Sequence, residues 1–384
     1  MHLRSYLHSA QQILTLYEGN VPLAAWLKLY FKEHKKYGSK DRRHITHLLY
    51  CYFRLGNAFH ELPVEERLKL GLYLCADAPN DLLQAVNESW NQLAPLPAAE
   101  KLQRFEASNQ ILNIFPFNAF LSPQIDTADF NLHFLQQPPV YLRLRPGKEQ
   151  KVKETFLQRD VPFTEIDSHC IAVNPNTKVD ALINLNADAV VQDRSSQQVL
   201  SVLDSEALKG KINIWDCCAA SGGKSILAWD AFEHVALTVS DVRESILHNL
   251  QNRFAQAGIR RYRSLVADVS KASPLKEKFD LVICDAPCSG SGTWGRTPEQ
   301  LRFFTEDRID HYTQLQKSIA INAAKNVKRG GQLLYITCSV FEAENEAIVQ
   351  FIQETTKLTL HRQAYFKGYD KAADTLFAAA FAAL

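Results

Sequence analysis

The sequence predicts an α/β protein whose second half forms a parallel β-sheet with helices on both faces. From about residue 205 onward, short apolar runs alternate with segments that have the spacing of amphipathic helices. Apolar strands separated by helices are typical of parallel sheets that are buried on both sides. We expect strands at 212–215, 235–239, 264–266, 279–284 and 332–336, and helices near 225–232, 244–257 and 309–327.

The first part of the chain has a helical pattern instead. Between Ile45 and Leu55, apolar side chains recur at spacings of three and four residues, which predicts a packed helix. Residues 38–43, just before this stretch, supply a turn and an N-terminal cap. Because strand-like runs are few in this region, we expect residues 1–127 to form an all-helical domain.

A short α/β region is expected between these two parts. Ser122-Pro123 and Pro138-Pro139 interrupt the helical pattern and predict a linker at about 122–139. The elements expected after it are a strand at 140–145, a helix at 149–159, a hairpin of 161–166 with 170–173, and a strand at 190–191. A chain of 384 residues is long enough for two or three domains, and we expect three, at 1–127, 128–204 and 205–384.

The composition is that of an ordinary globular protein, with 46% hydrophobic and 22% charged residues. No run of eighteen apolar residues occurs, and the first fourteen residues do not suit a signal peptide because Arg4 and two histidines interrupt them. We therefore expect a cytoplasmic protein without a membrane partner. The spacings of Cys217 with Cys218 and of Cys284 with Cys288 do not match paired zinc ligands, so no metal is expected.

Positive charge is concentrated near the N-terminus. Residues 1–56 contain nine Lys or Arg and three Asp or Glu, which gives +6, whereas the whole chain carries +1. A basic N-terminal region on a nearly neutral protein favours a phosphate-backbone partner. The alternative is a solvated helix face without a partner, which composition alone leaves open.

A glycine-containing loop follows the first strand of the predicted parallel sheet, with the sequence Asp216-Cys217-Cys218-Ala219-Ala220-Ser221-Gly222-Gly223-Lys224-Ser225. In such sheets, ligands bind beyond the carboxyl ends of the strands. A P-loop is excluded because Cys218 stands where its first glycine is required. The dinucleotide fingerprint is also missing, which disfavours a nicotinamide-dependent oxidoreductase. A nucleoside-binding loop remains, with a plain tight turn as the alternative.

Acidic residues follow the next two strands. Asp241 comes after the second strand and Asp268 after the third, and Asp216 ends the first. A carboxylate in such a position can accept hydrogen bonds from ribose hydroxyls. Each acid alone is more often a helix cap than a ligand, but three at successive strand ends indicate a binding site.

Two cysteines follow the fourth and fifth strands. Cys288 lies in Asp285-Ala286-Pro287-Cys288-Ser289-Gly290, and Cys338 lies in Thr337-Cys338-Ser339. Buried, inert thiols are the alternative, but both loops are polar and close to glycine. A thiolate that adds to carbon 6 of cytosine makes carbon 5 nucleophilic enough to take a methyl group. An acid near ring nitrogen 3 assists this addition, and a second thiol can assist release of the product.

These motifs resemble those of the RsmB/NOP2/Sun family of RNA 5-methylcytosine methyltransferases, most closely its bacterial 16S ribosomal RNA branch. The family's glycine loop, Asp-x-Cys-Ala-Ala-Pro-Gly-Gly-Lys-Thr, corresponds to residues 216–225, and its Asp-Ala-Pro-Cys-Ser-Gly signature is present at 285–290. Its Thr-Cys-Ser signature is present at 337–339, followed by Glu344-Asn345-Glu346. Two positions depart from the family pattern: Ser221 replaces the loop proline, and Ser245 stands where a basic residue is expected.

The resemblance implies a Rossmann-like class I methyltransferase domain, preceded by a small RRM-like α/β domain and a NusB-like helical domain that binds RNA. It implies S-adenosyl-L-methionine as cofactor, and RNA as partner, specifically 16S ribosomal RNA, naked or in early assembly particles. The catalytic residues that it implies are Cys338 as nucleophile, Cys288 for product release, Asp285 at the cytosine ring and Lys224 to position Asp285. The cofactor-binding residues that it implies are Cys218, Ala219, Ala220, Ser221, Gly222, Gly223, Lys224, Asp241, Asp268 and Asp285.

Two alternatives to this function remain open. The chain could be a catalytically silent, methyltransferase-like RNA-binding factor for ribosome assembly, although retention of both cysteines and Asp285 argues against this. It could also be a 5-methylcytosine methyltransferase that acts on tRNA or another RNA. The sequence does not identify the modified nucleotide, because helical basic surfaces contact RNA largely through phosphates and shape.

Overall fold

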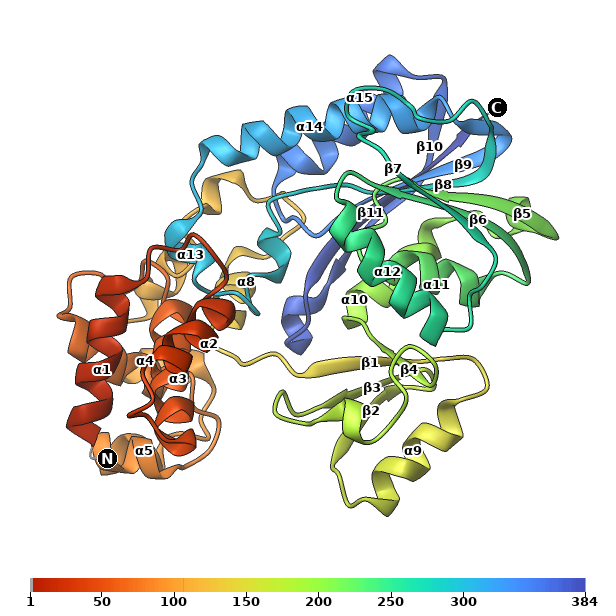
Figure 1. The fold of residues 1–384 in the computed structure, drawn as a ribbon. Coiled ribbons are helices and arrows are strands. Elements are labelled where there is room, and N and C mark those ends of the chain that lie inside the picture. Colours follow the sequence, from red (N-terminus) through yellow and green to blue (C-terminus); the bar gives the residue numbers. More distant parts are fainter. Residues whose placement is uncertain (1–2, 106, 384) are drawn as a thin grey trace. The chain divides into compact units, whose positions relative to one another are not determined.

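The computed structural model describes residues 3–105 and 107–383, shown in Figure 1. Its internal contacts divide the chain into two units. The first contains the residues up to Pro138 together with Thr293–Glu306, and the second contains Pro139–Gly292 and Asp307–Leu384. This division differs from the expected one at 1–127, 128–204 and 205–384, which stays a prediction.

The first unit is helical throughout its described residues. Its helices are α1 (Leu3–Leu16), α2 (Leu23–Glu33), α3 (Ser39–Arg54), α4 (Val64–Leu74), α5 (Asp81–Val86), α6 (Glu88–Gln92), α7 (Ala98–Arg104), α8 (Thr127–His133) and α13 (Gln300–Phe303). In α3, the buried side chains include Ile45, Leu48, Leu49, Tyr52 and Phe53. Their spacing of three and four residues is the predicted apolar face. The helix begins after Gly38, whose amide donates a hydrogen bond to Asp41 Oδ2 at 3.0 Å.

The expected linker at 122–139 is wrong in its central part, because α8 lies there. Phe130 and Phe134 are fully buried, one helical turn apart, and they pack on the ring of Phe115. The side chain of Asp126 caps the helix by accepting a hydrogen bond from the Asp129 amide at 2.9 Å. The prolines that flank this short helix concealed its apolar face in the sequence.

The segment Thr293–Glu306 belongs to the helical unit although it is distant from it in sequence. Glu299 is buried and accepts a hydrogen bond from the Leu23 amide at 3.0 Å. Arg302 donates to the hydroxyl of Tyr52 at 3.1 Å. Trp294 is also buried and packs on the ring of Phe304. This part of the expected domain 205–384 therefore contributes to the core of the other unit.

The second unit begins with a small antiparallel sheet of order β2-β3-β1-β4. Its elements are β1 (Val140–Leu144), α9 (Glu149–Gln158), β2 (Phe163–Asp167), β3 (Cys170–Val173) and β4 (Ala189–Val191). Val152 and Phe156 of α9 pack in one cluster with Leu142 and Ile171 of the sheet. The strands and the helix expected between 140 and 191 are thus confirmed within one or two residues.

The large sheet of this unit has seven strands in the order β10-β11-β9-β8-β5-β6-β7. The strands are β5 (Lys211–Asp216), β6 (His234–Asp241), β7 (Tyr262–Val266), β8 (Phe279–Asp285), β9 (Val327–Thr337), β10 (Leu358–Lys367) and β11 (Thr375–Ala383). The strands from β5 to β9 pair in parallel, as expected, whereas β11 pairs antiparallel with β9 and with β10. From β5 the chain first adds β6 and β7 on one side of the sheet, and it then crosses over to add β8 and β9 on the other side. The two neighbours of β5 are therefore β6 and β8.

Helices cover both faces of the large sheet (Figure 1). Its main helices are α10 (Arg194–Gln198), α11 (Gly223–Ala231), α12 (Glu244–Gln256), α14 (Asp307–Ala324) and α15 (Glu346–Thr355). Ile283 of β8 packs in one cluster with Ile226 of α11, whereas its neighbour Cys284 packs in a second cluster with Ile319 of α14. Because successive side chains of a strand point to opposite faces, the apolar runs bury both sides of the sheet.

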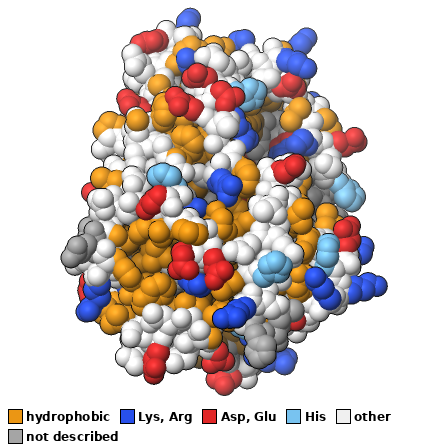
Figure 2. Space-filling view, turned by 90° about the vertical axis from the view of Figure 1, so that its left-hand side faces the viewer, with side chains coloured by type: hydrophobic (Ala, Val, Ile, Leu, Met, Phe, Trp, Pro, Cys, Tyr) orange, Lys and Arg blue, Asp and Glu red, His pale blue; other side chains and the backbone are white. Residues whose placement is uncertain are grey.

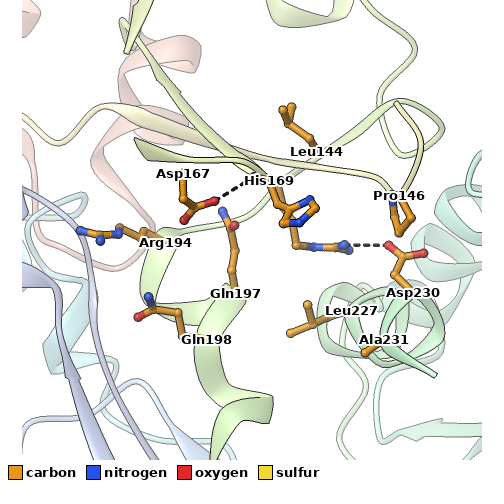
Figure 3. A pocket seen from close by; sticks show the side chains of 11 residues that line it. Leu144, Pro146, Asp167, His169, Arg194, Gln197, Gln198, Leu227, Asp230 and Ala231 are labelled. Atoms are coloured by element: carbon orange, nitrogen blue, oxygen red, sulfur yellow. Dashed lines mark hydrogen bonds and ion pairs between the residues drawn. The ribbon is translucent and has the colours of Figure 1, made fainter. Parts of the chain in front are cut away.

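The small sheet is joined to the large one by ion pairs to α11. Arg143 Nη1 lies 2.7 Å from Asp230 Oδ2, and Arg145 Nη2 lies 2.6 Å from Asp230 Oδ1. The pairs are largely buried, so they act as a fixed connection. A cavity of about 330 Å³ lies at this junction, with Asp230, His169 and Pro146 around it (Figure 3). None of the described helices is long and apolar enough to cross a membrane.

Candidate active site

A cavity of about 490 Å³ opens at the carboxyl ends of the parallel strands. Residues that follow five successive parallel strands line it, and α14 closes it on one side. The lining consists of Cys217, Cys218, Ala220, Asp241, Val242, Arg243, Ala267, Asp268, Val269, Ser270, Asp285, Ala286, Pro287, Cys288, Tyr312, Leu315, Ile319 and Cys338. The structure therefore brings Cys218, Ala220, Asp241, Asp268, Asp285 and both strand-end cysteines to one site.

The thiols of Cys288 and Cys338 face each other in this cavity, with their sulfur atoms 3.4 Å apart. The hydrogen bond that the two thiols share, together with burial, raises the pKa of Cys288 well above its ordinary value. Cys288 therefore stays protonated and can donate its S–H to the sulfur of Cys338.

Lys224 and Asp285 form an ion pair beside the two thiols. Lys224 lies in the first turn of α11, and its Nζ is 3.3 Å from Asp285 Oδ2 at the end of β8. Burial lowers the pKa of Lys224, but the charges of Asp285 and Cys338 outweigh it, so the pKa lies above its ordinary value. The ammonium group is therefore charged at neutral pH and ion-paired with Asp285.

Glu344 holds the two cysteine loops together, a function that the sequence did not indicate. Its carboxylate is fully buried and accepts hydrogen bonds from Ser289, which follows Cys288, and from Ser339, which follows Cys338. The amide of Ser289 donates to Oε1 at 2.9 Å, and Gln316 of α14 donates to the same oxygen at 2.9 Å. One buried side chain thus fixes the residue after each thiol. The resemblance included Glu344 after the Thr-Cys-Ser signature, but it implied no contact between this residue and the two loops.

Asn345 adds a second set of contacts to the Cys338 loop. Its side-chain oxygen accepts a hydrogen bond from Thr337 Oγ1 at 2.5 Å, and its nitrogen donates to the carbonyl oxygen of Ser339 at 2.9 Å. The side-chain amide of Asn345 therefore holds the residue on each side of Cys338. The same nitrogen donates to the hydroxyl of Tyr365 on β10, which connects the loop to the edge of the sheet.

Asp241, at the end of β6, is 6% exposed and lines the cavity. Its Oδ2 accepts a hydrogen bond from the Ala220 amide at 3.0 Å, and its Oδ1 accepts one from the Arg243 amide at 2.9 Å. The carboxylate thus fixes the glycine loop and its own strand end. Oδ1 also accepts a hydrogen bond from Arg243 Nε at 3.2 Å, so the remaining lone pair of Oδ2 is available to a ligand.

Asp268 lies beyond β7 at the other end of the cavity and is more exposed, with 34% of its side-chain surface accessible. Hydrogen bonds from the hydroxyl and amide of Ser270 lower its pKa, and Lys271 lies 3.3 Å from its Oδ2. The group is therefore a carboxylate at neutral pH. Asp268 lines the cavity, its bonds to Ser270 also form a local turn, and its contact with a ligand stays a prediction.

The glycine loop divides into residues that line the cavity and residues that do not. Cys218 and Ala220 line it, whereas Ala219, Ser221, Gly222 and Gly223 lie outside the lining. Gly222 has φ +84°, and a Cβ at this position would meet Phe254 of α12 at 2.6 Å. The glycine is therefore required for the turn and for close packing of α12 on the loop. Contact between these four residues and a ligand stays a prediction.

Asp216 ends β5 beneath this loop and is fully buried. Its Oδ2 accepts a hydrogen bond from Ser225 Oγ at 2.6 Å. Burial raises the pKa of Asp216 to about 7, and the nearby Asp285 contributes to the rise. This acid does not line the cavity, so it acts on the site through the loop that covers it.

The sheet order and the position of the cavity define a class of protein. Parallel strands that reverse their order beside β5, followed by an antiparallel edge, form the expected Rossmann-like class I methyltransferase fold. Residues 203–376 match the sequence model of a family described as 16S rRNA methyltransferase RsmB/F. These residues are somewhat less than half of the chain, and over them the chain is similar to the RsmB/F methyltransferases.

Individual relatives agree with this assignment. The ribosomal RNA small subunit methyltransferase B of Xanthomonas campestris pv. campestris is 34% identical over 173 residues, which are 44% of this chain and 39% of that protein. The tRNA (cytosine(49)-C(5))-methyltransferase of Pyrococcus abyssi is 26% identical over 59% of this chain and 73% of its own length. The chain thus spans well under half the length of the Xanthomonas relative that it matches.

A solved structure described as PH0851 is similar along nearly the whole chain. It superposes with a TM-score of 0.68 and covers 99% of this chain and 98% of its own, at 21% sequence identity. At this level of identity the similarity concerns the fold. It extends beyond residues 203–376 and includes the helical part, for which a NusB-like fold stays a prediction.

Proposed function

We propose that this protein methylates carbon 5 of cytosine in RNA, with S-adenosyl-L-methionine as methyl donor and 16S ribosomal RNA as substrate. The observation that carries the proposal is the pair of thiols, 3.4 Å apart, at the ends of β8 and β9. Both line a cavity that also contains the acids at the ends of β6, β7 and β8. An attacking thiolate, a second thiol and an acid are the groups that this reaction requires.

The residues of the cavity fit S-adenosyl-L-methionine. Asp241 would accept hydrogen bonds from the ribose hydroxyls, and the partly exposed Asp268 would contact the adenine. The exposed side chain of Val242 and the side chains of Val269 and Ile319 offer apolar surface to a base. Cys218 and Ala220, with Asp285 beyond them, border the methionine part. When bound, the cofactor supplies an electrophilic methyl group.

The reaction begins at Cys338, whose thiolate attacks carbon 6 of a cytosine that has left its stack. The bond formed is sulfur to carbon 6, and the electron pair of the 5,6 double bond moves toward ring nitrogen 3. Nitrogen 3 takes up a proton that the Lys224 ammonium group supplies through Asp285, and Lys224 Nζ, 3.3 Å from Asp285 Oδ2, also holds that side chain in place. Carbon 5 thereby becomes nucleophilic enough to react with an electrophilic methyl group.

Release of the product needs the carbon 5 proton and the bond to Cys338 to be removed. Cys288 is the group nearest to Cys338 that can exchange a proton at this point, because its sulfur contacts that of Cys338. A raised pKa keeps Cys288 a thiol until the substrate is bound, so it does not compete as nucleophile. Once Cys338 is bonded to carbon 6, it no longer shares a proton with Cys288, so Cys288 can release its proton to water. The Cys288 thiolate then accepts the carbon 5 proton while the sulfur of Cys338 leaves carbon 6 as a thiolate.

We infer that the helical unit contributes RNA affinity through five basic residues, of which all but Arg42 are exposed: Lys35, Lys36, Lys40, Arg42 and Arg43. Arg42 is half-buried and donates to the Tyr37 carbonyl oxygen at 2.9 Å, so its first task is structural. On the face shown in Figure 2, Lys and Arg side chains are scattered around a broad hydrophobic area. Scattered charge suits contacts to phosphates along a path rather than recognition of one base.

Cytosine methylation in 16S ribosomal RNA is tested by bisulfite sequencing of total RNA from cells with and without the gene. We expect one or more cytosines of 16S ribosomal RNA to lose protection in cells that lack the gene. Loss of protection only in tRNA would support the alternative substrate, which the Pyrococcus relative makes the second candidate. Purified protein that binds S-adenosyl-L-methionine but never turns over would instead indicate a silent assembly factor.

A further inference from the structure

Ser221, which stands where the resembling family has proline, is held by a distant arginine. Arg253 Nη1, from α12, donates hydrogen bonds to the carbonyl oxygen of Ser221 at 3.0 Å and to its Oγ at 2.8 Å. The amide of Ser221 makes no hydrogen bond within the described residues, so the guanidinium group is its main attachment. A charged donor to two oxygens of one residue is a strong local constraint.

The other side of the same guanidinium group is also occupied. Arg253 Nε donates to Asn186 Oδ1 at 3.0 Å, and Asn186 Nδ2 donates to Gln256 Oε1 at 2.7 Å. Asn186 precedes β4 and has φ +65°, and its carbonyl oxygen accepts a hydrogen bond from Arg145 at 2.7 Å. Arg145 is in turn paired with Asp230 of α11. Arg253 therefore joins the glycine loop to a rigid network between the small sheet and the large one.

The residue before Ser221 connects this network to the cavity. Ala220 lines the cavity and donates its amide to Asp241 Oδ2 at 3.0 Å. Its φ of +45° is unusual for alanine, so the backbone here must be held by its neighbours. Proline at 221 would fix its own φ at about −65° through its ring, whereas serine leaves this angle free.

We propose that Arg253 is a positioning residue for cofactor binding, and that its hydrogen bonds to Ser221 replace the backbone restriction that a proline would supply. The proposal rests on the proposed function in one respect, that S-adenosyl-L-methionine binds beside Ala220. It assigns to a side chain outside the cavity the task of keeping the loop in its binding conformation. Arg253 does not touch the cofactor.

The test is a double-mutant cycle on cofactor affinity, measured by isothermal titration calorimetry with the full chain. Arg253→Met should weaken S-adenosyl-L-methionine binding about tenfold, the scale of a lost charged hydrogen bond. Ser221→Pro should leave affinity within about twofold of the original, since the ring restores the restriction. In the double variant, affinity should stay close to that of Ser221→Pro, because the loop no longer needs the arginine.

The double variant shows whether Arg253 acts on cofactor affinity by positioning the loop or only by stabilising the fold. Arg253→Met and the double variant should lose a similar amount of thermal stability, because both lose the bond to Asn186, but only the first should lose affinity. Arg263→Met is the matched control, since this exposed arginine pairs with Glu277 far from the loop, and it should change neither quantity. Unchanged affinity in Arg253→Met, or equal weakening in the double variant, would overturn the proposal. Absence of binding by the unaltered protein would overturn the proposed function itself.

Discussion

The sulfur atoms of Cys288 and Cys338 lie 3.4 Å apart, although 50 residues separate them in the sequence. They meet because β8 and β9 are parallel neighbours, so the loops that follow them leave the sheet at the same edge. The amide of Gly292 donates to the carbonyl oxygen of Cys338 at 2.9 Å, which ties the two loops directly. Any residue other than glycine is excluded at position 292, because its Cβ would lie 2.0 Å from the Thr375 carbonyl oxygen.

The first prediction divides the work between the two thiols. Cys338→Ala removes the nucleophile, so methylation and the covalent RNA adduct should both be lost. Cys288→Ala leaves attack and methyl transfer possible but slows elimination, so protein attached to RNA should accumulate. Denaturing gel electrophoresis with labelled RNA measures both outcomes.

Cys75→Ala, which removes a thiol of the helical unit, is the control and should keep full activity. Loss of the adduct in Cys288→Ala, with accumulation in Cys338→Ala, would reverse the two assignments. Full activity of both variants would show that the thiol mechanism is wrong.

The sequence indicated much of this site because the site lies at strand ends. Apolar runs define where β5, β6, β8 and β9 stop, and the first polar residues after them then face one edge of the sheet. For this reason Cys288, Cys338, Asp285 and Asp241 could be brought together before the structure was known. The edge strand β10 was not predicted, because most of its residues are only partly buried and carry no alternating pattern.

Contacts between loops could not be predicted in the same way. Glu344 gives no periodic signal, and its importance follows only from where Ser289 and Ser339 lie in space. The same holds for Thr293–Glu306, whose packing into the helical unit depends on the side chains of Trp294 and Glu299 finding partners far away in sequence.

The second prediction concerns Glu344. Glu344→Ala leaves Ser289, Ser339 and Gln316 without their shared acceptor, which should cost about 2–4 kcal/mol of stability and loosen both cysteine loops. Adduct formation with RNA should slow at least tenfold, whereas S-adenosyl-L-methionine affinity should change little because Glu344 does not line the cavity. The rate of adduct formation is measured by quenching the reaction at set times and running denaturing gels. Cofactor affinity is measured separately by calorimetry.

Glu344→Gln keeps one acceptor oxygen and should recover part of the rate. Glu342→Gln, an exposed change in the same turn, serves as control and should have no effect. A rate in Glu344→Ala equal to that of the unaltered protein would remove Glu344 from the positioning of the thiols.

The third prediction concerns Asp241. Replacement by alanine removes the proposed ribose acceptor and also the partner of the Ala220 amide, so cofactor affinity should fall by about 1–3 kcal/mol. Calorimetric titration with S-adenosyl-L-methionine measures the change. Asp241→Asn keeps an oxygen for the Ala220 amide and should lose less. An unchanged dissociation constant in the alanine variant would exclude Asp241 from the binding site.

The fourth prediction concerns RNA binding by the helical unit. Deletion of residues 1–127 would remove the partners of Thr293–Glu306, so charge reversal in the full chain is the cleaner test. The variant carries the four changes Lys35→Glu, Lys36→Glu, Lys40→Glu and Arg43→Glu. It should bind RNA more weakly and with less salt dependence. The slope of log affinity against log salt concentration should fall by about 0.7–0.9 for each lost phosphate contact. Filter binding at several salt concentrations measures both.

The matched control reverses four exposed charges that precede strands of the large sheet, at the edge opposite to the cavity: Arg260, Arg261, Lys276 and Lys357. It changes the net charge by the same amount, so it should reduce binding only slightly. Equal losses in the two variants would mean that net charge, and not the helical surface, determines affinity.

The fifth prediction concerns the buried acid beneath the glycine loop. The pKa of Asp216 is raised to about 7 in the folded protein, from an ordinary value of 3.8. The folded state therefore holds a proton that the unfolded state has already lost, and this contribution to stability declines as pH rises from about 4 to 7. One pKa unit corresponds to about 1.4 kcal/mol, so the full effect is on the order of 4 kcal/mol.

Asp216→Asn cannot ionise and should show a flatter dependence of unfolding free energy on pH. Denaturant unfolding at pH 5 and pH 8 measures the difference, with the exposed Asp180→Asn as control. Equal pH dependence in Asp216→Asn and the unaltered protein would mean that Asp216 is ionised throughout this range.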